Sequence, residues 1–148
     1  MPQYDGHYYQ AVTAAVDYAT ALKLASIATF KGLAGHLVTI NSAEENAFVT
    51  GLMKNSWIAV DDRDAEGVFK YSAAPEYGSV PSYLAWGHGQ PDNAGKKEHC
   101  VQLWNALSLP NNWNDRSCTE RLTYVIEYEC PAGQVDTASG CQGMCLPC

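Results

Sequence analysis

The first 99 residues of this 148-residue chain contain no cysteine. All six cysteines come later, and four of them fall within the last 19 residues. An even count at this spacing favours disulfides, which persist in oxidising compartments. Metal binding by Cys141, Cys145 and Cys148 is the weaker alternative, because no histidine lies in the tail. The sequence therefore predicts a secreted or extracellular protein.

The chain is also poor in basic residues and in long apolar runs. It has 9 Lys and Arg against 16 Asp and Glu, giving a net charge of −7. This balance opposes binding to nucleic acid or to an anionic membrane surface. No apolar stretch approaches the length of a membrane span, so we expect no membrane insertion. The segment Met1–Gly6 lacks the basic and apolar parts of a signal peptide, so a secreted chain of this sequence is a mature or excised segment.

Residue patterns predict an α+β fold with one antiparallel sheet. Asp17 is placed to cap a first helix, and Ser42 with Glu45 has the residues of a capping box for a second. Helices early in the chain and strands late are typical of α+β proteins. We expect helices at residues 17–31 and 42–54, and strands at residues 7–12, 37–40, 57–60, 68–71, 100–104 and 122–129.

Two segments have little regular pattern. Residues 72–93 are rich in Pro, Gly, Ser and Tyr, and a loop this long inside a compact domain is usually functional. From Pro131 the composition shifts to Gly, Ser, Thr and Cys. We therefore divide the chain into a main domain, residues 1–130, and a cysteine-rich tail, residues 131–148, which is a small module or the beginning of one.

Oxygen-bearing side chains gather late in the main domain. They are Gln90, Asp92, Glu98, Asn114 and Asp115. Carboxylate and amide oxygens are the ligands that Ca²⁺ takes, and three acids are enough to offset a divalent ion. No Cys/His cluster accompanies them, which disfavours zinc at these residues. They predict a calcium site if the fold brings them together.

The order of several short motifs resembles that of C-type lectin-like domains. The motifs are His36-Leu37-Val38-Thr39-Ile40-Asn41-Ser42 with Glu44-Glu45, Trp57-Ile58, Glu66-Gly67, Gln90-Pro91-Asp92, Glu98-His99-Cys100-Val101, Trp113-Asn114-Asp115 and Cys118. Each motif alone is weak, but their ordered succession over roughly residues 6–130 is specific. The resemblance implies a C-type lectin fold: two helices against antiparallel sheets, pairing of the first and last strands, and a long calcium-binding loop.

The resemblance also implies calcium-dependent sugar binding. Gln90, Asp92, Glu98, Asn114 and Asp115 would bind both the Ca²⁺ and two sugar hydroxyls, with a cis peptide bond at Pro91. In the family, Gln-Pro-Asp resembles galactose or N-acetylgalactosamine selection, and Glu-Pro-Asn resembles mannose or glucose selection. Residues 93–97 lack the stacking aromatic residue that usually follows the galactose-type motif. Tyr83, Trp86, His88 and Trp104 are the alternatives for this role, and Trp86, in the irregular loop, is the one we expect to be exposed.

A second calcium site of the family would use Asp62, Glu66 and Asn93 together with Glu98. The acid that commonly follows the glutamate is replaced here by His99, and imidazole is a poor ligand for Ca²⁺. Asp62 and its neighbouring acids are equally consistent with a solvated turn.

Cysteine pairing follows the family in one respect and departs from it in another. Cys100 and Cys118 match the pair that clips the long-loop region. Cys130 matches the end of the last strand, but its usual partner in the first helix is missing. Cys130 must therefore pair within the tail, pair with a partner chain, or stay free.

Three further expectations complete the sequence-based picture. No nucleophile–base arrangement is visible, so we expect a binding protein and no enzyme. The alternative to sugar binding is a protein-recognition or extracellular assembly module, acting as a homo-oligomer or as part of a larger protein. His7 and His36 have no partner cluster in the sequence, and we expect both to be structural; Trp57, Trp104 and Trp113 are expected in the core.

Overall fold

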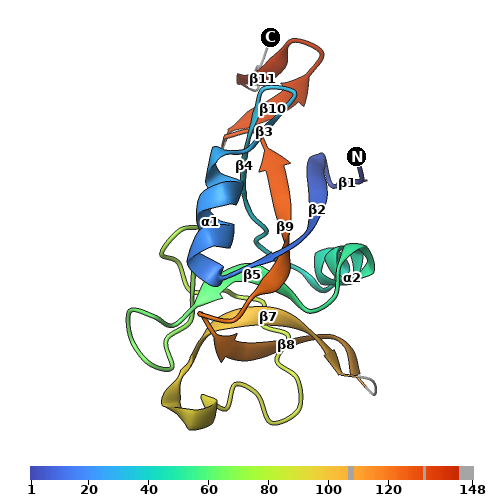
Figure 1. The fold of residues 1–148 in the computed structure, drawn as a ribbon. Coiled ribbons are helices and arrows are strands. Elements are labelled where there is room, and N and C mark those ends of the chain that lie inside the picture. The colour runs from blue at the N-terminus through green and yellow to red at the C-terminus, as the bar shows by residue number, and fades with distance from the viewer. Residues whose placement is uncertain (107–108, 132, 144–148) are drawn as a thin grey trace.

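The computed structural model describes residues 1–106, 109–131 and 133–143 (Figure 1). Its elements are β1 (Gln3–Tyr4), β2 (His7–Val16), α1 (Tyr18–Ile27), β3 (Thr29–Phe30), β4 (Leu33–Leu37), α2 (Ala43–Leu52), β5 (Ser56–Asp61), β6 (Lys70–Tyr71), a 3-10 turn (Ala94–Lys96), β7 (Glu98–Ala106), β8 (Leu109–Ser117), β9 (Leu122–Glu129), β10 (Gln134–Thr137) and β11 (Gly140–Gly143).

Strands β1 to β9 form one sheet, in which β9 is the central strand. Its main path runs β1-β2-β9-β5-β7-β8, with β4 also beside β9. Tyr8 of β2 pairs with Tyr128 of β9, so the first long strand and the last strand of this sheet lie together, as the family resemblance implies. The expectation of a purely antiparallel sheet was wrong in one place, because β5 and β9 pair in parallel.

Helix α1 begins where predicted but ends early. Asp17 Oδ1 accepts a hydrogen bond from the Thr20 N–H at 2.8 Å, which satisfies one of the free N–H groups of the first turn. The helix stops at Ile27, and Thr29–Phe30 pairs instead with β4 as a short hairpin. Gly32 at the turn has a φ of +77°, a left-handed value that favours glycine. Residues 29–31, predicted as helix, therefore belong to this hairpin.

Helix α2 has the predicted capping residues, with one change. Ser42 Oγ accepts from the Glu45 N–H at 3.1 Å, as a capping box requires. The carboxylate of Glu45 reaches back to the N–H of Asn41 at 2.8 Å, one residue before the cap. Its other oxygen accepts a hydrogen bond from the buried Tyr9 hydroxyl at 2.7 Å. The start of α2 is thereby tied to strand β2.

Two apolar clusters form the core. Tyr18 and Trp57, whose rings meet edge to face, lie in the first; the second contains Val49, Val101 and Trp113. Trp57 and Trp113 are fully buried, as expected, whereas Trp104 is only partly buried.

The predicted strands at 57–60, 100–104 and 122–129 are confirmed, and the strand at 68–71 is reduced to Lys70–Tyr71. The strand predicted at residues 37–40 is shifted: β4 ends at Leu37. Beyond it, the Val38 N–H still donates a backbone hydrogen bond to the Val125 carbonyl. Strand β8 was not predicted, because its centre was interpreted only as a metal-binding motif. Between residues 72 and 93 the chain forms no helix or strand, only an isolated bridge between Trp86 and Trp113.

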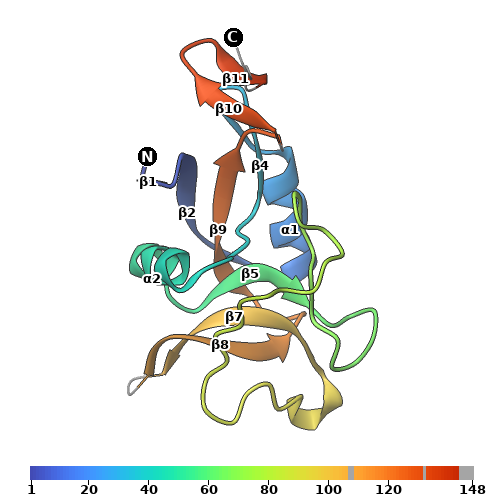
Figure 2. The ribbon, with the colours of Figure 1, turned by 180° about the vertical axis from the view of Figure 1, so that it is seen from behind.

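The tail folds into a hairpin of its own. Strands β10 and β11 form a separate two-stranded sheet, and Cys130 pairs with Cys141. Cys130 thus pairs within the tail, one of its three predicted alternatives; Cys145 and Cys148 lie outside the described residues. Figure 2, like Figure 1, shows this hairpin and the N-terminus toward one end of the molecule and strands β7 and β8 at the other. The domain division at residue 130 stays a prediction.

Candidate functional site

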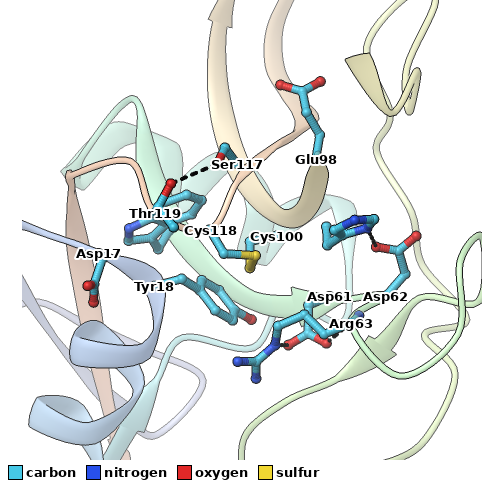
Figure 3. Close-up of a disulfide and its surroundings, with 12 residues drawn as sticks. Asp17, Tyr18, Asp61, Asp62, Arg63, Glu98, Cys100, Ser117, Cys118 and Thr119 are labelled. Atoms are coloured by element: carbon cyan, nitrogen blue, oxygen red, sulfur yellow. Dashed lines mark hydrogen bonds and ion pairs between the residues drawn. A yellow bond between two sulfur atoms is a disulfide. The ribbon is translucent and has the colours of Figure 1, made fainter. Parts of the chain in front are cut away.

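Strands β7 and β8 carry three of the five predicted calcium ligands, Glu98, Asn114 and Asp115. Their register sets Val101 opposite Asp115 and Gln102 opposite Asn114, and Glu98 begins β7. The predicted disulfide between Cys100 and Cys118 links β7 to the segment after β8. Figure 3 shows this disulfide close to the ring of Tyr18, with Glu98 at the start of β7 and Asp62 drawn in the same surroundings.

Asp115 anchors the loop that carries Gln90 and Asp92. Its side chain is fully buried, and Oδ1 accepts from the Asp92 N–H at 3.1 Å while Oδ2 accepts from the Asn93 N–H at 2.7 Å. The Gln90–Pro91 peptide bond is cis, as the resemblance implies. Through Asp115, the irregular loop is fixed against β8.

Oxygens of three other residues surround one terminal atom of the Gln90 amide. That atom lies 2.7 Å from Asn114 Oδ1, 2.9 Å from Asp115 Oδ1 and 3.2 Å from Asp92 Oδ1. With nitrogen at this position it faces three acceptors, although an amide NH₂ has only two hydrogens to donate. With oxygen at this position, four oxygens from four residues converge, which is the donor set of a hard cation such as Ca²⁺.

Carboxylates crowd the same place. Oxygens of Asp92, Glu98 and Asp115 lie within 4.8 Å of one another. Burial and then the hydrogen bond to Asp92 raise the pKa of Glu98 to about 7. Burial likewise raises the pKa of Asp115. Negative charge is therefore disfavoured here until a cation offsets it, which fits a calcium site.

Gln102 is a residue of the candidate site that sequence reasoning missed. It is buried on β7, and its Oε1 accepts from Asn114 Nδ2 at 2.9 Å. This bond fixes the Asn114 amide so that its oxygen faces Gln90. Only the pairing of β7 with β8 identifies Gln102, and β8 was not expected from the sequence.

The residues of the second calcium site also come together, but a histidine lies among them. His99 Nδ1 is 3.2 Å from Asp62 Oδ1 and 3.1 Å from Glu66 Oε2. Asn93 Nδ2 donates to Glu66 Oε1 at 2.8 Å. One imidazole nitrogen thus contacts both acids, and a second calcium site at these residues stays a prediction.

Trp86 does not extend into solvent as expected. It is half-buried and makes edge-to-face contacts with Phe69, at 4.8 Å between ring centroids, and with Trp113, at 6.2 Å. Its ring packs against the second core cluster, and contact between Trp86 and a sugar stays a prediction.

The sequence matches the model of the lectin C-type domain over residues 30–128. The chain is 36% identical over 103 residues to salivary C-type lectin 2 of Aedes albopictus, covering 62% of this chain and 66% of that protein. It is 31% identical over 130 residues to the alpha-N-acetylgalactosamine-specific lectin of Patiria pectinifera, covering 82% and 74%. It covers only 1% of halomucin of Haloquadratum walsbyi, at 29% identity. The chain thus spans less than two thirds of several curated relatives.

Solved structures have the same fold. The carbohydrate-recognition domain of the mouse scavenger receptor C-type lectin superposes with a TM-score of 0.72 at 27% identity, covering 85% of this chain and 92% of that one. Herring type II antifreeze protein superposes with a TM-score of 0.69 at 23% identity, covering 84% of this chain and 92% of that one. At this identity the similarity shows a shared fold alone.

These findings define a C-type lectin fold with an oxygen-lined site in its long-loop region. The chain belongs to the C-type lectin domain family. The family is generally calcium-binding and non-enzymatic.

Proposed function

We propose that this protein binds carbohydrate through a Ca²⁺ held by Gln90, Asp92, Glu98, Asn114 and Asp115. The single observation that supports this most strongly is the Gln90 amide, whose terminal atom faces three oxygens of Asp92, Asn114 and Asp115. A bound Ca²⁺ supplies positive charge to this oxygen cluster and leaves open positions for neutral ligands.

Two neighbouring sugar hydroxyls are the neutral ligands that suit these residues. A hydroxyl both donates and accepts, so each can donate to a carboxylate and accept from an amide N–H while an oxygen lone pair faces the ion. Acid and amide groups are adjacent here, since Asp115 and Asn114 are neighbours on β8 and Asp92 lies beside Gln90.

The order amide then acid in Gln90-Pro91-Asp92 supports a galactose or N-acetylgalactosamine preference. The name of the Patiria pectinifera relative points to the same sugar class. Because Trp86 packs against Phe69 and Trp113, a sugar face would gain little stacking area from it. We therefore attribute the preference to hydrogen-bond polarity.

Chromatography on two sugars tests the proposal. The chain is passed over immobilised galactose and immobilised mannose with Ca²⁺, and then eluted with a chelator. Retention on galactose and release by chelator are expected. Retention that survives the chelator would contradict the calcium-dependent mechanism, and stronger retention on mannose would contradict the sugar preference.

A non-sugar role on the same fold is the second candidate. The herring antifreeze protein shares the fold, and residues 93–97 contain no aromatic side chain for a galactose face. Under this alternative the domain recognises protein or assembles outside the cell. Calcium binding measured by calorimetry, without retention on either sugar resin, would favour it.

The proposal also includes the location of the protein and its assembly. The disulfides Cys100–Cys118 and Cys130–Cys141 suit a secreted or extracellular location. In the described part of the chain, no helix has both the length and the apolar character needed to cross a membrane. Weak single-site sugar binding gains strength when sites are linked, so we propose that the domain acts as an oligomer or within a larger protein.

A further inference from the structure

A third cluster of metal-type ligands lies on strands β2, β4 and β9, away from the calcium candidate on β7 and β8. His7 Nδ1 is 2.7 Å from Glu127 Oε1, and His7 Nε2 is 3.1 Å from Glu129 Oε2. His36 Nε2 is 2.7 Å from Glu129 Oε1. The expectation that His7 and His36 have no partner cluster was therefore wrong.

Strand pairing builds this cluster. His7 is on β2, His36 on β4 and the two glutamates on β9, and β9 pairs with both neighbours. Glu127 and Glu129 are two residues apart, so their side chains share one face of the sheet. His36 lies directly opposite Glu127 in the β4–β9 register.

The donor set suits a transition metal of the Zn²⁺ type. One ligand atom each from His7, Glu127 and Glu129 lies within 4.8 Å of the others. Imidazole nitrogen together with carboxylate oxygen is a common zinc set, with a remaining position for water. Ca²⁺ prefers oxygen ligands alone, so the histidine separates this site chemically from the one at Asp115.

Outer contacts hold the carboxylates in place. Glu127 is buried, and its Oε2 accepts from the Thr39 N–H at 3.1 Å. His36 Nδ1 lies 2.8 Å from the Leu37 carbonyl, which only accepts, so Nδ1 carries a proton and His36 Nε2 faces Glu129. Metal ligands are usually oriented by such second contacts. His36 is accordingly a positioning residue for Glu129.

The cluster has access to solvent and a charge requirement. His7 and Glu129 line a cavity of about 470 Å³ that also touches the tail at Asp136. Two carboxylates side by side need about two positive charges, from protonated imidazoles or from one divalent ion. A divalent metal that displaces the proton of His7 supplies this charge, while His36 keeps both of its protons and still donates to Glu129.

We propose that His7, Glu127 and Glu129 form a zinc-type metal site on the β2–β9 face, with His36 orienting Glu129. The site ties the first long strand to the last strand of the large sheet. It is separate from the proposed calcium and sugar site, and either can be absent without the other.

Calorimetric titration of the full chain with ZnCl₂ at pH 7.5 tests this site, with excess Ca²⁺ present to occupy the oxygen cluster. We expect saturable zinc binding that His7→Gln and Glu129→Gln each weaken by at least the roughly 10- to 100-fold typical for loss of a residue that only orients a ligand, because each removes a ligand. Glu44→Gln changes a carboxylate in the exposed first turn of α2 and should bind zinc like the wild type. Circular dichroism checks that each variant is folded.

Three results would overturn the proposal. They are no zinc binding by the wild type, undiminished binding by folded His7→Gln, and loss of binding in His99→Gln instead. The last result would locate the zinc at Asp62, Glu66 and His99.

Discussion

The backbone N–H of Asp92 donates a hydrogen bond to the carboxylate of Asp115 at 3.1 Å, across 23 residues of sequence. The carboxylate that is proposed to bind Ca²⁺ therefore also holds the loop that presents the other ligands. Loop position and ion binding are coupled through this one side chain.

Asp115→Ala should abolish calcium binding and retention on a sugar resin. Without Ca²⁺ it should also lower the free energy of unfolding by about 1–3 kcal/mol, because the N–H groups of Asp92 and Asn93 lose their acceptor. Calcium calorimetry and urea unfolding measure the two effects. Asp64→Ala removes an exposed acid and should change neither quantity. Normal calcium affinity in Asp115→Ala would rule out the site as described.

The double substitution Gln90→Glu with Asp92→Asn should invert the sugar preference. It exchanges acid and amide while keeping side-chain size, so each sugar hydroxyl meets a donor where it met an acceptor. Relative retention on galactose and mannose resins, before and after exchange, is the measurement. Calcium affinity is the control, because the number of acids and amides is unchanged. An unaltered sugar order would show that other residues set specificity.

His99→Asp should create a second calcium site. The substitution removes the imidazole that bridges Asp62 and Glu66 and supplies a carboxylate in its place. Calorimetry should show about twice the calcium stoichiometry of the wild type, since the new oxygen set satisfies the preference of the ion. His99→Asn lacks the added charge and serves as the matched control. Equal stoichiometry in His99→Asp and wild type would contradict this expectation.

Stability of the metal-free chain should depend on pH through His7. The hydrogen bond with Glu127 is the largest cause that raises the pKa of His7, to about 9 from 6.5, against partial burial. A raised pKa means that the folded state holds this proton more tightly than the unfolded state. The stabilisation is therefore complete below about pH 6.5 and is lost as the pH rises through about 9.

Urea unfolding with a chelator at pH 6, 7.5 and 9.5 measures this dependence. His7→Gln should flatten the decline between pH 6.5 and 9, because the titrating partner of Glu127 is gone. A decline as steep in His7→Gln as in the wild type would assign the pH dependence to other groups.

Gly35→Ala and Gly51→Ala should have opposite effects on stability. A Cβ at Gly35 would lie 2.8 Å from the Ala25 carbonyl oxygen and 2.9 Å from Ile126 Cγ2, so overpacking should cost about 1–3 kcal/mol. A Cβ at Gly51 in α2 meets nothing within 4 Å, and alanine there should stabilise by about 0.5–1 kcal/mol. Thermal unfolding of both variants is the test. A stabilised Gly35→Ala would show that β4 has room to shift away from α1.

Sequence reasoning identified the calcium candidates because their types are chemically distinctive and their order follows the family. The sequence predicts Asp92, Glu98 and Asp115 as ligands, and the structure places oxygens of the three carboxylates within 4.8 Å of one another. The helix caps at Asp17 and Ser42 could also be predicted from the sequence, because a cap depends on residues only three positions apart.

Contacts that depend on how distant strands pair could not be predicted from the sequence. His7 and Glu127 are 120 residues apart, and only the pairing of β2 with β9 brings them together. Gln102 acquires its role from the register of β7 with β8. The parallel pairing of β5 with β9 likewise follows from the path of the whole chain, which no local pattern encodes.

The arrangement seen in Figures 1 and 2 has a practical consequence for measurement. Because the N-terminus lies toward the end opposite β7 and β8, a tag, bead or surface joined at the N-terminus keeps clear of these two strands. A chip coated in this way displays the loops outward in a common orientation. Dense coating then imitates a clustered array, so apparent avidity should rise with surface density while the intrinsic single-site affinity stays constant.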